Sequence, residues 1–210
     1  TDPQPPDPEI IERELADGET WNHQMQTEAT AVARVHTIER AIETVVTDLP
    51  EEYAEDFIDL LESNLRKAIR LEAREMNTEL DEFPWPLYAG GSDLHNSKLK
   101  EVLLEELRSF LEEWIATEPS AADRRALLER YLNDFRLFRR LGLYLLSQNA
   151  AAFPEIVQEE LLAEENYDAY SIQQEFFQLL QDGYPVLSGG EQNQVLSIID
   201  EGPNRAELVE

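Results

Sequence analysis

Cysteine is absent from this chain of 210 residues, and lysine and histidine occur only three times each. Without cysteine the chain can form no disulfide and offers no thiolate as a metal ligand or nucleophile. No apolar run approaches the roughly 20 residues that a membrane-spanning helix needs, so we expect no membrane partner. No signal peptide is visible, and we expect a cytoplasmic protein. Because the chain starts at Thr1 rather than Met, we expect it to be processed or cut from a longer protein.

Positive charge is also scarce, since 17 basic residues face 45 acidic ones and the net charge is −28. This balance excludes a protein that binds the phosphate backbone of nucleic acids, because such proteins need clustered Lys and Arg. Hydrophobic residues still make up 42% of the chain, enough for a sizeable core and unlike a disordered acidic tail. A carboxylate surface stays hydrated in concentrated salt, and molar salt screens its self-repulsion. The composition therefore predicts a salt-adapted protein.

Apolar residues recur with the 3.6-residue period of a helix along most of the chain, and Pro, Gly and Ser mark the ends of these segments. No segment is a convincing strand, so the fold class is predicted to be all-α. The predicted helices cover approximately residues 9–17, 21–47, 50–80, 98–116, 121–133, 135–149, 154–165, 172–183 and 189–201.

Composition shifts predict the domain organisation. The predicted parts are a Pro-rich lead-in (1–8), a helical hairpin region (9–80), an apolar loop (81–97), a helical array (98–203) and a tail (204–210). A tight turn at 48–50 should join two antiparallel helices of the hairpin region. The later helices are irregular in length and separated by short turns, which favours a HEAT-like α-solenoid, with a closed bundle as the alternative.

The stretch "LSGGEQNQVLSIIDEGP" at 187–203 looks like the signature loop and Walker B strand of an ATP-binding cassette ATPase. A signature loop needs a Walker A loop to hold the nucleotide, and no G-x-x-x-x-G-K-[ST] occurs in this chain. The "IIDE" segment also follows too closely, because a helix separates the two motifs in a real ATPase. Ser188 and Glu191 instead match the S-x-x-E capping box, so we predict an ordinary helix start.

No catalytic, metal or cofactor site is indicated. The histidines lack the Glu-x-x-His spacing of a di-iron bundle, because Thr20 and Ala33 stand three residues before His23 and His36. His36 with Glu39 and Glu43 could hold a divalent ion, but a solvated helix face is the simpler interpretation. Carboxylate pairs arise by chance among 45 acids and do not by themselves indicate acid–base catalysis.

The one local anomaly is the arginine cluster, which places six of the 17 basic residues within 17 positions. Its members are Arg124, Arg125, Arg130, Arg136, Arg139 and Arg140. Two functional interpretations are open, a sensor for an anion or nucleotide phosphate and a surface that docks another domain. The structural alternative is pairing with acids of neighbouring helices, such as Glu129, Asp134, Glu155 and Glu159. The candidate docking surface comprises Arg124, Arg125, Arg136, Arg139 and Arg140.

The order of segments from about residue 85 to 203 supports a family resemblance. The segments are "FPWPLYAGGSDLHNSKLKEVLLEELRSFLEEW", "ALLERYLNDFRLFRRLGLYLLSQN", "PEIVQEELL" and "EFFQLLQDGYPVLSGGEQNQVLSIIDEGP". This order resembles the helical-repeat region that follows the nucleotide-binding core in large STAND/NACHT-type signalling ATPases of bacteria and archaea. The resemblance implies a HEAT-like array and carries over no catalytic residue, because the ATPase core lies outside this chain.

Together these observations predict a non-catalytic scaffold or sensor region of a larger signalling ATPase, without a cofactor. Its expected partner is another protein or its own ATPase core, and the sequence does not fix an oligomeric state. The alternative is a free-standing acidic interaction protein, or a nucleic-acid mimic that occupies a basic partner.

Overall fold

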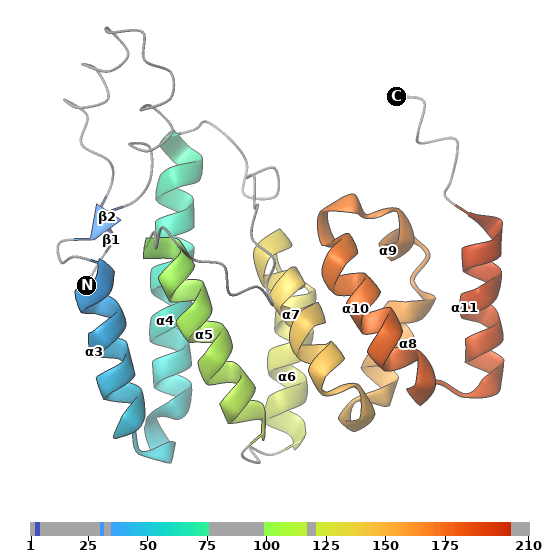
Figure 1. Cartoon of the computed structure of the whole chain (residues 1–210), viewed down its shortest axis with the longest axis horizontal. Coiled ribbons are helices and arrows are strands. Elements are labelled where there is room, and N and C mark those ends of the chain that lie inside the picture. The colour runs from blue at the N-terminus through green and yellow to red at the C-terminus, as the bar shows by residue number, and fades with distance from the viewer. Residues whose placement is uncertain (1–2, 5–29, 32–34, 76–98, 117–120, 203–210) are drawn as a thin grey trace, which may run out of the picture. The chain divides into compact units, whose positions relative to one another are not determined.

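The computed structural model describes residues 3–4, 30–31, 35–75, 99–116 and 121–202 (Figure 1). The described elements fall into two compact units. The first unit comprises β1 (Pro3–Gln4), β2 (Thr30–Ala31), α3 (Val35–Thr47), η1 (Glu51–Tyr53), α4 (Ala54–Glu75) and α5 (Leu99–Ala116). Apart from the two-residue antiparallel pair of β1 and β2, these elements are helical.

In the first unit α5 packs along α4 and also contacts α3 (Figure 1). Its apolar side chains recur at helical spacing and are buried, among them Leu107, Leu111 and Ile115. Phe57 of α4 meets Phe110 of α5 edge to face, with 5.0 Å between the ring centroids. The core of this unit is therefore the surface that α5 shares with α4, as its apolar stripe predicts.

The predicted helix at 21–47 is wrong at its start. Residues 30–31 form strand β2, and α3 begins only at Val35. Thr30 and Ala31 pair with Gln4 and Pro3 of β1, a contact with a distant part of the chain that the local period does not reveal. The predicted helix at 9–17, the loop at 81–97, the end of the helix at 76–80 and the tail at 204–210 lie outside the described residues.

The second unit contains the remaining helices. They are α6 (Ala121–Leu132), α7 (Arg136–Gln148), η2 (Ala150–Ala152), α8 (Pro154–Leu162), α9 (Glu165–Asp168), η3 (Tyr170–Ile172), α10 (Gln173–Gly183), η4 (Tyr184–Val186) and α11 (Gly189–Glu201). Those of nine or more residues begin and end close to the predicted positions, whereas the shorter ones were not predicted. Pro154 occupies the first turn of α8, where its missing N–H costs no hydrogen bond.

Helix α7 is the centre of the second unit, because it packs against both α6 and α10. Helix α8 in turn packs against α10 and α11 (Figure 1). Phe138, Leu141 and Phe176 in this core have no exposed surface. Gly142 permits the close approach of α6, because a Cβ atom there would lie 3.1 Å from Cβ of Tyr131.

The all-α prediction is confirmed for the described residues, apart from the short β1–β2 pair. The two units divide between α5 and α6, whereas the sequence placed the helix at 98–116 with those that follow it. The apolar stripe of α5 explains its place, since that stripe is buried against α4.

Candidate functional site

The arginine cluster is spread over two helices and over different depths. Arg124, Arg125 and Arg130 lie on α6, while Arg136, Arg139 and Arg140 lie on α7. Arg125 and Arg130 are exposed, Arg140 is buried, and the other three lie between these limits. The structure therefore does not gather the predicted docking residues on one exposed face.

Two arginines on α6 interact with nearby residues of their own unit. Arg125 donates a hydrogen bond of 2.7 Å from Nε to Oε1 of Glu129, one of the acids named from the sequence, although it lies on the same helix rather than on a neighbouring one. This bond raises the pKa of Arg125, and the charges of Glu129, Glu155 and Glu159 add to the effect. The guanidinium of Arg124 lies 5.8 Å from the ring centroid of Phe153, within cation–π range.

Arg139 joins three parts of the second unit. Its guanidinium donates to the carbonyl oxygen of Leu132, to Oε2 of Glu160 at 3.1 Å and to Oδ1 of Asn166 at 2.8 Å. Burial raises the pKa of Glu160, while Arg139 and Asn166 oppose that rise. Arg139 therefore serves as a structural link from α7 to the end of α6 and to α8.

Arg140 forms the most deeply buried ion pair of this unit with Glu175 of α10. Its Nε and Nη2 atoms both donate to Oε1 of Glu175, at 2.9 and 2.7 Å. The side chains of Arg140 and Glu175 are only 7% and 1% exposed. The pair lies at a polar cavity of about 620 Å³ that Arg136 and Tyr170 also line.

A second hollow of the same unit, the α10–α11 groove, has a different chemistry and a volume of about 880 Å³. Its apolar lining consists of Tyr167, Phe177, Leu180, Ile198 and Ile199. Phe177 and Ile199 leave 50% and 45% of their surface exposed. Large apolar side chains that converge on one hollow are typical of protein interaction sites.

Hydrogen bonds and a ring contact within the second unit hold both walls of the α10–α11 groove in place. The ring of Tyr167 meets Phe176 edge to face at 4.9 Å, and its hydroxyl donates to the carbonyl oxygen of Leu161 at 2.8 Å. On the other wall, Gln192 of α11 donates to the carbonyl oxygens of Tyr184 and Leu187. Both walls are therefore positioned without any contribution from a partner.

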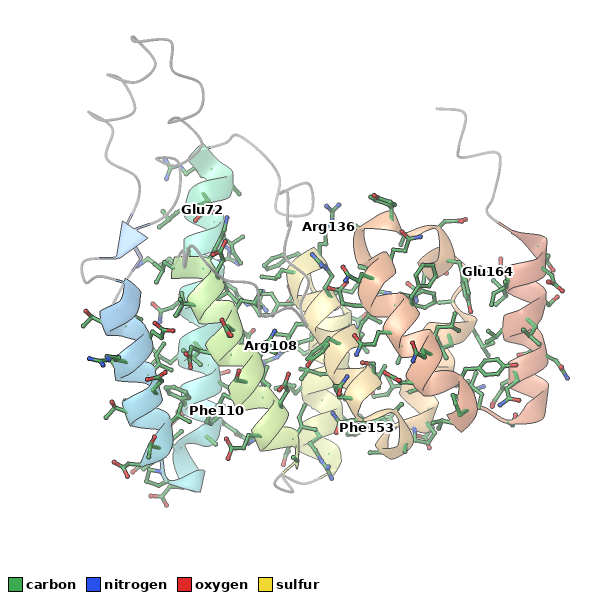
Figure 2. All side chains as sticks on the ribbon, viewed as in Figure 1. Glu72, Arg108, Phe110, Arg136, Phe153 and Glu164 are labelled. Carbon is green, nitrogen blue, oxygen red and sulfur yellow. The ribbon has the colours of Figure 1, made fainter. Side chains whose placement is uncertain are left out.

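The rim of the groove is acidic. Glu164, Asp168 and Glu201 line it and are exposed, and the uncharged Gln173 and Gly202 also line it. In the view of Figure 2, Glu164 lies between α9 and α11. Apolar walls with a negatively charged rim match an apolar surface that carries positive charge at its edges.

The groove residues were not predicted from the sequence, although two signals were present. The segment "EFFQLL" places Phe176 and Phe177 side by side, and adjacent helical residues cannot both face one core. The structure buries Phe176 completely and leaves Phe177 half exposed. The segment "VLSII" in α11 carries the same signal, since only Val195 of its apolar residues is buried.

A second feature not predicted from the sequence is a basic face on α4 in the first unit. Arg66, Lys67, Arg70 and Arg74 line a hollow of about 540 Å³ together with Glu62 and neighbouring residues. Arg66 donates to Oε1 of Glu62 from Nε at 3.0 Å and from Nη2 at 2.7 Å. Their spacing along one helix was the signal that could have identified them.

The ATPase-like stretch forms a helix start, as predicted. The backbone N–H of Ser188 donates to Oε2 of Glu191 at 2.6 Å, and the N–H of Glu191 donates to Oγ of Ser188 at 3.5 Å. These two bonds make the capping box. The "IIDE" residues form the last turns of α11 rather than a strand, and Gly202 ends the helix with φ of 71°.

Within the described ranges, no group of three or more His, Asp or Glu side chains could hold a metal ion. His23 and His95 lie outside those ranges, and His36 is described only as part of the backbone of α3. In the same part of the chain, no helix is both long and apolar enough to cross a membrane.

Among known proteins, no family model, no curated protein and no solved structure matches this chain. The resemblance to the helical-repeat region of STAND/NACHT-type ATPases therefore stays a prediction.

Proposed function

We propose that this chain is a non-catalytic helical scaffold of a larger signalling ATPase, which acts by binding a protein partner or its own nucleotide-binding core. The α10–α11 groove is the observation that carries this proposal. Its half-exposed Phe177 and Ile199 offer apolar surface that a folded partner can bury. We further propose that the protein acts in the cytoplasm of a salt-adapted organism, in line with its net charge of −28.

The helix contacts of the second unit support a HEAT-like array. Helices α6 and α7 pack as one pair, and α8 and α10 pack as the next. Between these two pairs, α7 packs against α10, and α8 also packs against α11, the helix that follows them in the chain. In a helical repeat each pair of helices likewise contacts its neighbours along the chain.

The test uses the complete reading frame. We expect it to encode a Walker A loop upstream of these residues. We also expect the chain to co-elute with the separately expressed nucleotide-binding core during size exclusion in molar KCl. A frame without that loop, or separate elution at micromolar concentrations, would contradict the proposal. Calorimetry with ATP and magnesium should detect no binding by the chain itself, and a micromolar site of unit stoichiometry would contradict its non-catalytic role.

The alternative function is that of a free-standing acidic protein that occupies a basic partner or mimics a nucleic acid. The net charge of −28 favours this alternative. Such binding depends on the density of carboxylates rather than on apolar surface, so it should disappear in molar salt. Binding to the nucleotide-binding core should persist there.

A further inference from the structure

Helix α11 occupies the position of the first helix in a third pair. It packs against α8, which is the first helix of the preceding pair. The second helix of a third pair would pack against α11 and against α10. The α10–α11 groove, with its apolar residues from both helices, lies along those same two elements.

The second helix of the first pair, α7, shows one chemistry that suits such a position, whereas α10, the second helix of the second pair, has acidic residues and no basic one. Helix α7 carries Arg136, Arg139 and Arg140 and has no acidic residue. Arg139 and Arg140 bind Glu160 of α8 and Glu175 of α10, which belong to the next pair. A basic helix that meets acids of its neighbours is therefore already a contact of this unit.

The α10–α11 groove offers acids for a similar contact. Glu164, Asp168 and Glu201 surround the apolar lining and are exposed. An acidic helix would bring like charges together at Glu164 and Glu201, whereas Lys or Arg flanking an apolar stripe would pair with these two carboxylates.

We propose that the α10–α11 groove binds a basic amphipathic helix of a partner protein, which packs as the second helix of the third pair. The apolar stripe of this helix buries Phe177 and Ile199, and its basic flanks meet the acidic rim. This proposal rests on the proposed function, since it names the chemistry of the partner that the scaffold binds.

The probes are three synthetic peptides of about 18 residues, a length at which isolated helices become stable enough to test. The first carries leucines at i, i+3, i+7 and i+10 with lysine and arginine beside them on an alanine background. The second has glutamate in place of every basic residue, and the third keeps the composition of the first but disperses its leucines around the helix.

Binding is measured by fluorescence anisotropy in KCl from molar down to the lowest concentration at which the circular dichroism of the chain is unchanged. We expect the first peptide to bind with 1:1 stoichiometry throughout. The dispersed peptide should bind at least tenfold more weakly in molar KCl, where general attraction to an acidic protein is screened. At the lowest KCl concentration, the acidic peptide should bind at least tenfold more weakly than the first peptide.

Two variants of the chain test where the peptide binds, and a third variant serves as a matched control. Phe177→Glu and Ile199→Asp should each weaken binding of the first peptide at least tenfold. Leu196→Asp changes a residue of α11 that is 47% exposed but does not line the groove, so binding should be unchanged. Circular dichroism melts confirm that all three variants fold.

Absence of binding, equal binding of the dispersed peptide in molar KCl, or an equal loss in Leu196→Asp would overturn the proposal. A last arm repeats the titration with the full-length protein. If the first peptide no longer binds there, a helix of the same polypeptide fills the groove and the partner assignment is wrong. Co-elution with the nucleotide-binding core is a separate measurement, so it can succeed when this proposal fails.

Discussion

The ion pair between Arg140 and Glu175 differs in kind from the other contacts of the arginine cluster. Both side chains are almost completely buried, and Oε1 of Glu175 accepts two hydrogen bonds from one guanidinium. A buried charge that loses its partner keeps its full desolvation penalty, whereas an exposed pair is screened by water and salt. The contribution of each arginine to stability is therefore set by depth rather than by membership of the cluster.

We predict that Glu175→Gln lowers the free energy of unfolding by about 3–5 kcal/mol, because the charge of Arg140 then stays buried without a counter-charge. Replacing both residues, as Arg140→Met with Glu175→Leu, should recover most of this loss. The measurement is urea unfolding in molar KCl. Arg125→Gln is the control, since its pair with Glu129 is exposed, and it should cause no measurable loss. If Glu175→Gln also causes no measurable loss of stability, the buried-pair argument is contradicted.

Glu106 on α5 is a carboxyl group whose surroundings disfavour its charged form. Burial raises its pKa from 4.5 to about 7, and the charges of Glu43, Glu105 and Glu39 add to the rise. Two of these neighbours, Glu39 and Glu43, come from α3, so like charges accumulate where α3 and α5 pack together.

The raised pKa of Glu106 predicts a pH dependence with a definite sign. Between about pH 4.5 and about pH 7 the folded state binds more protons than the unfolded state, so stability falls as pH rises through this window. The loss should be about 1–2 kcal/mol, because the group is partly solvated. Glu106→Gln should remove this component and be more stable than the parent above pH 7. Urea unfolding at a series of pH values tests this, and an identical slope in both proteins would contradict it.

At the scale of helices, two glycines lie in opposite environments, one tightly packed and one open. Gly183 ends α10 against α8, and a Cβ atom there would lie 2.7 Å from Cγ1 of Val157. Gly190 lies in the first turn of α11, where a Cβ atom would meet only Oγ of Ser188 at 3.9 Å. The first glycine allows two helices to approach, whereas the second occupies open space.

The same substitution should therefore have opposite effects at the two positions. Gly183→Ala should destabilise the chain by about 1–3 kcal/mol, the usual effect of overpacking a core. Gly190→Ala should stabilise it by up to about 1 kcal/mol, because alanine has the higher helix propensity. Thermal melts in molar KCl compare them. If Val157→Ala does not reduce the effect of Gly183→Ala in a double-mutant cycle, the proposed contact is not its cause.

The helices themselves were largely predictable, because their ends depend on local chemistry. The capping box of Ser188 with Glu191 marks the start of α11, and Pro154 marks the start of α8. The start of α3 was missed because Thr30 and Ala31 pair with β1, and the period of the apolar residues does not reveal such a long-range contact. The α10–α11 groove was missed because exposure is a property of packing: periodicity does not reveal which of Phe176 and Phe177 faces the core.

The depth of the arginines could not be predicted for the same reason. Sequence spacing placed Arg136 and Arg140 on one helical face, but Glu175 lies 35 residues after Arg140 in the chain. Local pairs such as Arg125 with Glu129 follow from the i, i+4 rule, although the sequence analysis expected partners on neighbouring helices. A long-range ion pair depends on which helices become neighbours, and that follows from the tertiary fold.

At the scale of the whole chain, net charge dominates the dependence on solvent. A charge of −28 repels itself strongly when the Debye length is roughly 30 Å, at 0.01 M salt, and much less when it is roughly 3 Å, at 1 M. We predict that helical circular dichroism weakens and the Tm falls as KCl drops from molar to millimolar concentrations. Lowering the pH to about 4.5 should reduce this salt dependence, because protonation of the carboxylates removes the repelling charges. Sucrose at matched osmolality is the control for effects that are not electrostatic, and it should not restore the Tm at low KCl. A Tm that stays constant across the KCl range at neutral pH would contradict the prediction of a salt-adapted protein.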